Sequence, residues 1–79
     1  MLDGEEVVMI FGERIVLLRR RQGLTQQTVA RLSGLNTNTI SRLERGDILD
    51  PSGSVVVRLA RALHTTTDYL LGLADEESP

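Results

Sequence analysis

Residues 24–46, LTQQTVARLSGLNTNTISRLERG, decide the fold of this chain of 79 residues. Two short helical patterns in this stretch are separated by residues 33–35, a turn with a central glycine. Each pattern starts with a residue type that caps helix N-termini well, Thr25 in the first and Asn36 in the second. An apolar residue before each cap is matched by another inside the helix, as in a hydrophobic staple. Because glycine takes the left-handed conformation at little cost, the chain can change direction sharply between them. The stretch therefore predicts a helix-turn-helix.

Similar helical patterns precede and follow this pair, whereas no segment alternates apolar and polar residues for long enough to form a strand. In the first pattern Phe11, Ile15 and Leu18 follow the helical repeat, and Gly23 ends it. We therefore expect an all-α fold of five helices. With their caps, the expected helices cover residues 8–21, 25–34, 36–46, 51–63 and 66–72.

A chain of this length has room for one compact domain. We expect a single helix-turn-helix domain at residues 1–79, with its core at 10–72. An N-terminal extension at 1–9 precedes this core, and an acidic tail at 73–79 follows it. Because so short a chain buries little apolar surface by itself, contact with a second subunit would add buried area.

Charge is distributed unevenly along the chain, although the formal net charge is only −2. Residues 14–45 contain seven arginines and one glutamate, residues 1–13 contain four acids and no base, and residues 46–79 contain six acids and two arginines. A basic segment between acidic ends is expected when one face of a protein meets phosphate. An ordinary solvated surface gives the same pattern, so charge alone does not decide between the two.

Composition excludes several kinds of site. The chain has no cysteine and a single histidine, His64, which we interpret as a loop residue, so we expect no metal site. Ser41 has neither histidine nor lysine in register to activate it, and no glycine-rich phosphate loop occurs. We therefore expect no cofactor and no enzymatic activity.

The sequence also bears on location. No apolar run is long enough to span a bilayer, and the acidic first residues do not form a signal peptide. We expect a cytoplasmic protein with no membrane partner, associated with the nucleoid if it binds DNA.

The third expected helix has two distinct faces. Ile40 and Leu43 are spaced to face the body of the domain. A helix that presents its N-terminal residues to the DNA major groove needs hydrogen-bonding side chains there, because base edges display donors and acceptors. A solvent-exposed polar face is the alternative interpretation. The opposite face carries Thr37, Asn38, Ser41, Arg42 and Arg45.

Many residues in register resemble the Cro/XRE group of λ-repressor-like helix-turn-helix DNA-binding proteins. The resemblance covers residues 10–72, nearly the whole chain, and is therefore far more specific than one short motif. It is carried by Phe11-Gly12-Glu13-Arg14-Ile15, Leu18-Arg19, Gly23-Leu24-Thr25-Gln26, Val29-Ala30, Ser33-Gly34-Leu35, Ile40-Ser41, Leu43-Glu44, Gly46, Pro51-Ser52, Leu59-Ala60, Ala62-Leu63 and Asp68-Tyr69-Leu70-Leu71.

The resemblance implies that four residues of the third helix, Thr37, Asn38, Ser41 and Arg42, occupy the variable positions that read bases. Their chemistry is compatible with this role. Asn38 can pair with adenine and Arg42 with guanine, and Thr37 can hydrogen-bond or pack on a thymine methyl group.

Other roles implied by the resemblance are structural or concern the DNA backbone. Gln26 matches a glutamine that contacts a phosphate and braces the recognition helix. Thr39 and Arg45 match positions near the phosphate backbone. Arg19 and Glu44 match a pair that often forms a salt bridge between the first and third helices, and such a pair is costly to break on one side only.

The chain also departs from the family pattern. Asp47 and Asp50 follow the third helix where many relatives carry lysine or arginine, and two acids there would repel phosphate. We therefore expect modest affinity or a shifted docking pose. Gly53 and Thr65 occupy positions that are usually apolar. Apolar residues of the extension at 1–9 can lengthen the first helix or contribute to a subunit contact.

Together these features predict a sequence-specific regulator of transcription whose partner is double-stranded DNA, most simply a repressor. One such unit reads few base pairs, so a homodimer on a palindromic operator is expected. The fifth helix and neighbouring apolar residues are the expected dimer surface, with the extension sharing in it. The rival hypothesis is an antitoxin or other protein-interaction module on a helix-turn-helix scaffold, and the acidic loop after the third helix favours it slightly.

Overall fold

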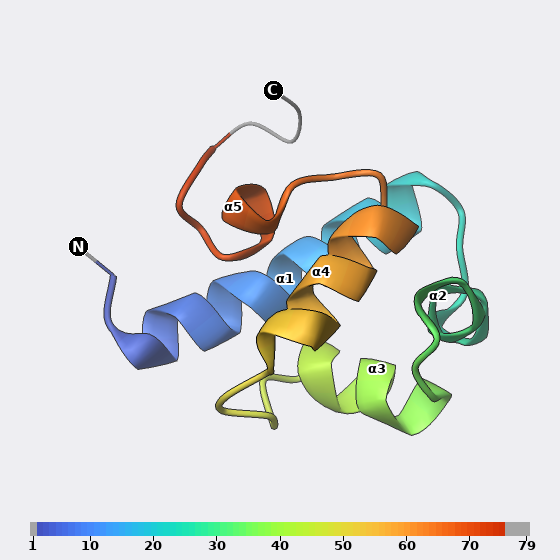
Figure 1. Ribbon diagram of the computed structural model, residues 1–79, viewed down its shortest axis with the longest axis horizontal. Coiled ribbons are helices and arrows are strands. Elements are labelled where there is room, and N and C mark those ends of the chain that lie inside the picture. Colours follow the sequence, from blue (N-terminus) through green and yellow to red (C-terminus); the bar gives the residue numbers. More distant parts are fainter. Residues whose placement is uncertain (1, 76–79) are drawn as a thin grey trace.

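Five helices make up the described part of the chain, residues 2–75 of the computed structural model (Figure 1). No strand occurs within this range, so the all-α prediction is confirmed. Residues 76–79 of the expected acidic tail lie outside the described residues. The helices are α1 (Gly4–Arg21), α2 (Gln26–Ser33), α3 (Thr37–Glu44), α4 (Gly53–Ala62) and α5 (Thr67–Leu70).

The helix-turn-helix forms through the caps that the sequence predicts. The side chain of Thr25 accepts a hydrogen bond from the backbone N–H of Thr28, and that of Asn36 accepts one from Thr39 at 2.7 Å. Gly34 between the two helices has φ +73°, a left-handed conformation that a side chain would strain. These local features fix where α2 ends and where α3 begins.

The N-terminal extension forms part of α1, which begins at Gly4 and not at residue 8 as predicted. Asp3 caps this helix, and its carboxylate accepts a hydrogen bond from the backbone N–H of Glu6 at 2.8 Å. Acidic side chains in the first turn also interact favourably with the positive end of the helix dipole. The extension therefore adds a turn of helix to the predicted one, an outcome that the sequence analysis left open.

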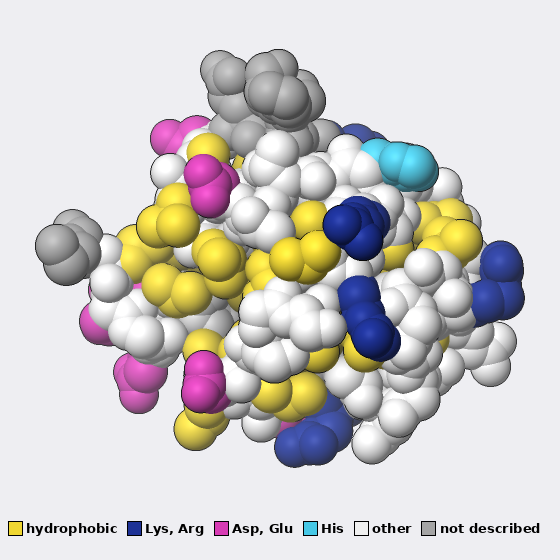
Figure 2. Space-filling model, in the orientation of Figure 1, with side chains coloured by type: hydrophobic (Ala, Val, Ile, Leu, Met, Phe, Trp, Pro, Cys, Tyr) yellow, Lys and Arg dark blue, Asp and Glu magenta, His cyan; other side chains and the backbone are white. Residues whose placement is uncertain are grey.

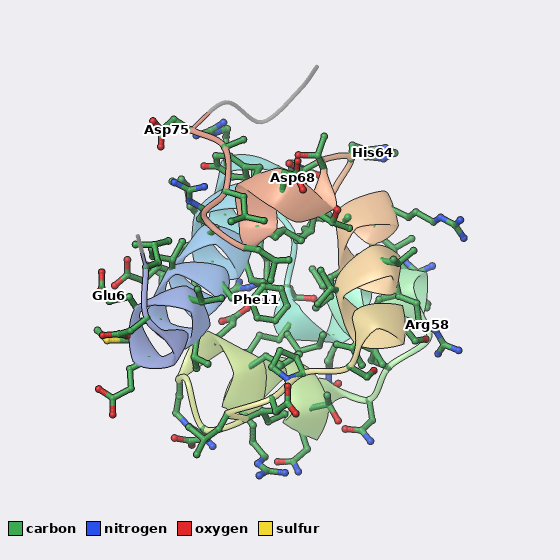
Figure 3. All side chains as sticks on the ribbon, turned by 60° about the vertical axis from the view of Figure 1, so that its left-hand side comes forward. Glu6, Phe11, Arg58, His64, Asp68 and Asp75 are labelled. Carbon is green, nitrogen blue, oxygen red and sulfur yellow. The ribbon has the colours of Figure 1, made fainter. Side chains whose placement is uncertain are left out.

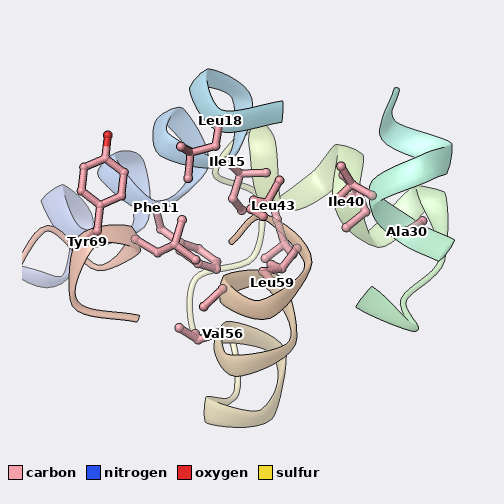
Figure 4. Packing of buried hydrophobic residues seen from close by; sticks show 13 residues of the cluster. Phe11, Ile15, Leu18, Ala30, Ile40, Leu43, Val56, Leu59 and Tyr69 are labelled. Carbon is pink, nitrogen blue, oxygen red and sulfur yellow. The ribbon is translucent and has the colours of Figure 1, made fainter. Parts of the chain in front are cut away.

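The core forms where α1 and α4 meet the remaining helices (Figure 4). In this cluster α1 packs against α3 and α5, and α4 packs against α2 and α5. Fully burying one such apolar side chain contributes about 1.5–3 kcal/mol to the free energy of folding. The largest completely buried side chains are Phe11, Ile15, Leu18, Val29, Ile40, Leu43, Leu59, Leu63 and Leu70.

The backbones of α1 and α3 approach each other closely at Gly12. A Cβ atom added there would lie 2.6 Å from the carbonyl oxygen of Leu43 and 2.9 Å from that of Glu44. These distances are shorter than a side-chain carbon tolerates. The absence of a side chain at Gly12 thus allows the C-terminal turn of α3 to rest directly on α1.

Candidate nucleic-acid interface

Helix α3 buries one face and exposes the other. Ile40 and Leu43 are no more than 2% exposed and belong to the core, as predicted. On the outer side Thr37, Asn38 and Arg42 are exposed, while Ser41 is half-buried. In Figure 3 polar side chains at this end of the molecule, below the ribbon of α3, extend away from the rest of the domain. The outer face is accessible to a large ligand.

Helix α3 is held in place by an ion pair with α1. Two hydrogen bonds join Arg19 to Glu44, from Nε to Oε2 at 2.7 Å and from the terminal nitrogen to Oε1 at 3.0 Å. The side chains of the two residues are only 13% and 6% exposed. Arg19 also donates to the carbonyl oxygen of Leu24 at 3.1 Å. The pair implied by the resemblance is therefore present, with the two-pronged geometry that makes such bonds strong.

A third group contacts the same carboxylate. Nε2 of Gln26, the first residue of α2, donates to Oε1 of Glu44 at 3.0 Å. Glu44 therefore accepts hydrogen bonds from both α1 and α2, and it fixes the orientation of α3 relative to the two. The amide nitrogen of Gln26 retains a second hydrogen for another acceptor.

Arg45 caps the end of α3 and is engaged within the chain. Its Nε donates to Oδ2 of Asp47 at 3.0 Å, and a terminal nitrogen donates to Oγ of Ser41 at 2.8 Å. Both partners of the ion pair are more than half exposed. Two predicted site residues, Ser41 and Arg45, thus contact each other, and the acidic residue after the helix takes part.

Arg14 has a role that the sequence analysis missed. Its guanidinium lies over the ring of Tyr69, 4.2 Å from the ring centre, and donates to the carbonyl oxygens of Tyr69 and Ala74. The carboxylate of Asp75 lies 3.8 Å away. Arg14 therefore holds α5 and the segment after it on α1. No periodicity or spacing in the sequence indicates a contact between residues so far apart.

These contacts change the interpretation of the basic segment at residues 14–45. Arg14 and Arg19 serve the interior of the fold, and Arg45 is paired with a carboxylate. The seven arginines counted in that segment therefore overstate the charge available to a ligand. Arg42 is exposed on α3, so its charge is available to a ligand.

Two other kinds of site are absent from the described residues. Within residues 2–75 no three acidic or histidine side chains are grouped so that they could hold a metal ion. In the same range no helix is both long enough and apolar enough to cross a membrane.

Sequence comparison matches the chain to known regulators. A family model described as helix-turn-helix, HTH_3, matches residues 15–70. The HTH-type transcriptional regulator ImmR of Bacillus subtilis is 34% identical over 64 residues, which are 81% of this chain and 50% of ImmR. Repressor protein C2 of Salmonella phage P22 is 32% identical over 62 residues, which are 78% of this chain and 28% of C2. The chain thus spans half or less of the length of these two relatives.

Solved structures agree with this match. The restriction-modification controller protein C.AhdI from Aeromonas hydrophila superimposes with a TM-score of 0.75 at 36% identity, over 80% of this chain and 94% of that one. The P22 c2 repressor, crystallised with a synthetic operator, gives a TM-score of 0.73 at 33% identity, over 77% and 91% of the two chains.

The fold and the exposed third helix define a helix-turn-helix domain of the λ-repressor type. The chain belongs to the HTH_3 family, the Cro/C1-type group that its sequence resembles. This is a family of DNA-binding regulators of transcription, not of enzymes.

Proposed function

We propose that the chain is a sequence-specific DNA-binding repressor that places α3 in the major groove of its operator. The outward face of α3 carries this proposal. Thr37, Asn38 and Arg42 are exposed on one side of a helix whose other side is fixed in the core. A rigid helix with hydrogen-bonding side chains near its N-terminus suits base edges in the major groove.

Each residue of the face has a proposed partner. Asn38 pairs with an adenine and Arg42 with a guanine, since each side chain can form two hydrogen bonds with that base. Thr37 at the start of α3 contacts a base edge or a thymine methyl group. Ser41 reads a base once the guanidinium of Arg45 has moved from its hydroxyl group.

The DNA backbone is held by residues around this face. One amide hydrogen of Gln26 remains hydrogen-bonded to the carboxylate of Glu44, and the other is donated to a phosphate. Thr39 is half-buried in the first turn of α3. In the proposed complex it lies close to the DNA strand that passes the N-terminus of this helix. Arg45 binds phosphate after exchanging the carboxylate of Asp47 for it. Phosphate contacts fix the position of the protein but carry no sequence information.

The proposed unit of binding is a homodimer on a palindromic operator, within the cytoplasm and at the nucleoid. A single domain of residues 1–79 reads too few base pairs for useful specificity, whereas two-fold symmetry doubles the site. The proposed dimer surface is α5 with neighbouring apolar residues. Leu73, just after α5, is 70% exposed and supports this choice.

Selection of bound duplexes from a random DNA library tests the proposal. We expect an enriched motif with two-fold symmetry, and an affinity that falls steeply with salt because bound phosphates release counterions. Sedimentation of the complex reports whether two chains bind one duplex. No enrichment at low ionic strength contradicts DNA binding, and an asymmetric motif bound by one chain contradicts the dimer alone.

A second candidate is an antitoxin or other protein-interaction module that uses the same scaffold. The ion pair between Arg45 and Asp47 favours it, because it neutralises an arginine at the edge of the DNA-reading face. On this hypothesis the chain gives no salt-dependent shift of any duplex, and its main ligand is a protein.

A further inference from the structure

An apolar groove lies on the side of the molecule formed by the N-terminal half of α1. It has a volume of about 370 Å³ and is bounded by α1, the loop between α3 and α4, and the end of α5. Phe11 of the core forms part of its lining, together with Val7, Leu49, Pro51 and Leu71. A smaller hollow next to it shares Val8 and Leu49 as lining residues. We call the two together the α1 groove.

The walls of the α1 groove expose more apolar surface than the fold requires. Leu49 is 78% exposed and Met9 is 60% exposed, although neither is needed to close the core. Single exposed apolar residues are common, but several around one hollow mark a contact surface. Figure 2 shows hydrophobic side chains gathered on this side, on the left of the view over the N-terminal part of α1.

The charged residues that line the groove all have the same sign. Among the residues that line its two hollows, Asp3, Glu5 and Asp50 are acidic and none is basic. Within residues 2–75 no salt bridge involves any of these three carboxylates. In Figure 2 the acidic side chains lie on the left, around the apolar region, whereas the arginines extend from the centre of the view to its right. A ligand of the groove therefore gains from being both apolar and positively charged.

We propose that the α1 groove binds a basic amphipathic segment of another protein, whose apolar side chains enter the groove while its lysines or arginines meet the acidic rim. DNA and anionic membrane surfaces are disfavoured by the same carboxylates. A two-fold contact through the groove itself would bring the same carboxylates together from both sides, so the dimer surface proposed above lies beside the groove, at α5 and Leu73. The chain's own last residues, 76–79, add two acids and no base, so they do not fit either.

Two labelled peptides test this proposal with the full chain. The probe is a helical leucine–lysine peptide of about 14 residues, roughly four turns, and its control carries glutamate in place of every lysine. We expect the lysine peptide to bind, as measured by fluorescence anisotropy, and the glutamate peptide not to bind. Equal binding of both peptides would overturn the charge argument and with it the proposal.

Matched surface variants locate the binding. Leu49→Ser should weaken binding of the lysine peptide about tenfold or more, since a buried leucine contributes that much to affinity. Leu32→Ser, which changes a half-exposed leucine on α2, should leave it unchanged. Glu5→Gln with Asp50→Asn should weaken binding and flatten its salt dependence, whereas Asp68→Asn on α5 should not. Equal effects of Leu49→Ser and Leu32→Ser would exclude the groove as the site.

Sedimentation distinguishes a basic segment of another protein from a second copy of this chain as the occupant of the groove. If Leu49→Ser dissociates a dimer of the chain, a second copy fills the groove and the proposal fails. Arg42→Ala should leave the peptide affinity unchanged, because Arg42 lines neither hollow. The peptide experiment and the DNA experiment can therefore fail independently of each other.

Discussion

The guanidinium of Arg45 donates to the carboxylate of Asp47 at 3.0 Å, so the arginine that caps the C-terminal end of α3 is paired within its own chain. Surface pairs of this kind contribute little free energy, about 0–1 kcal/mol, and a phosphate can replace the carboxylate. A duplex that approaches this end of α3 nevertheless meets a carboxylate beside the arginine. The balance between the two charges sets how strongly the C-terminal end of α3 holds DNA.

Replacing Asp47 with asparagine should therefore strengthen DNA binding about three- to fivefold, as expected from releasing a surface pair. The dependence of log affinity on log salt should become steeper by about 0.9, because no carboxylate then takes up a cation when Arg45 moves to a phosphate. Fluorescence anisotropy at several salt concentrations measures both. Asp68→Asn on α5 removes the same charge elsewhere and is the control. An equal gain in both variants would mean that net charge, not Arg45, is responsible.

Arg42→Ala should relax the base preference at one operator position and weaken specific binding by about 1–3 kcal/mol. The reason is the loss of two hydrogen bonds to one base, which is the contribution expected of arginine on guanine. Selection of duplexes with the variant and the parent checks this. A uniform loss on all sequences would identify Arg42 as a phosphate contact.

Gln26→Ala should weaken binding to all duplexes with little change in the selected motif, since the proposed contact is with phosphate. It also removes one of the hydrogen bonds to Glu44, so the thermal stability of the variant has to be measured in parallel. A changed motif would show that Gln26 contacts a base.

Glu44→Ala should lower the free energy of unfolding by about 3 kcal/mol, because Arg19 is left with little solvent and no carboxylate. Urea denaturation gives this value. Arg19→Met should cost a comparable amount, since it leaves the buried carboxylate of Glu44 without its cation. In a double-mutant cycle the coupling between the two positions should be well above that of a surface pair. Coupling near zero would mean that the pair does not hold α3.

Gly12→Ala should destabilise the fold by about 1–3 kcal/mol, the usual cost of overpacking. The new methyl group would meet the carbonyl oxygens of Leu43 and Glu44, and neither backbone group can rotate away. Calorimetric unfolding measures the loss. Gly4→Ala, at a position where an added Cβ meets nothing, is the matched control for helix α1.

Most of the fold can be predicted from the sequence because its signals are local. A cap such as Asn36 bonds to a backbone group three residues away, so a single short window contains the information. The start of α1 was predicted too late, although Asp3 followed by Glu6 has the spacing of a capping pair. The expected start at residue 8 follows the apolar repeat, which does not include residues 3–6.

The candidate site was predictable only in part. The faces of α3 follow from the 3.6-residue repeat, which separates Ile40 from its polar neighbours. The family resemblance supplied the pairing of Arg19 with Glu44, and composition did not. The attachment of Arg14 to α5 depends on the path of the chain in three dimensions, whereas Arg45 and Asp47 are only two residues apart and pair at the turn that ends α3. Charge counts along the sequence treat these arginines alike, although they have different roles.

The contact between α3 and Gly12 is formed by main-chain atoms. It therefore does not restrict which residues occupy the outward face of α3. Thr37, Asn38 and Arg42 can therefore be exchanged together without disturbing the attachment of the helix. A set of such triple variants, all built on the same backbone, would offer a route to retargeting this domain to other DNA sequences.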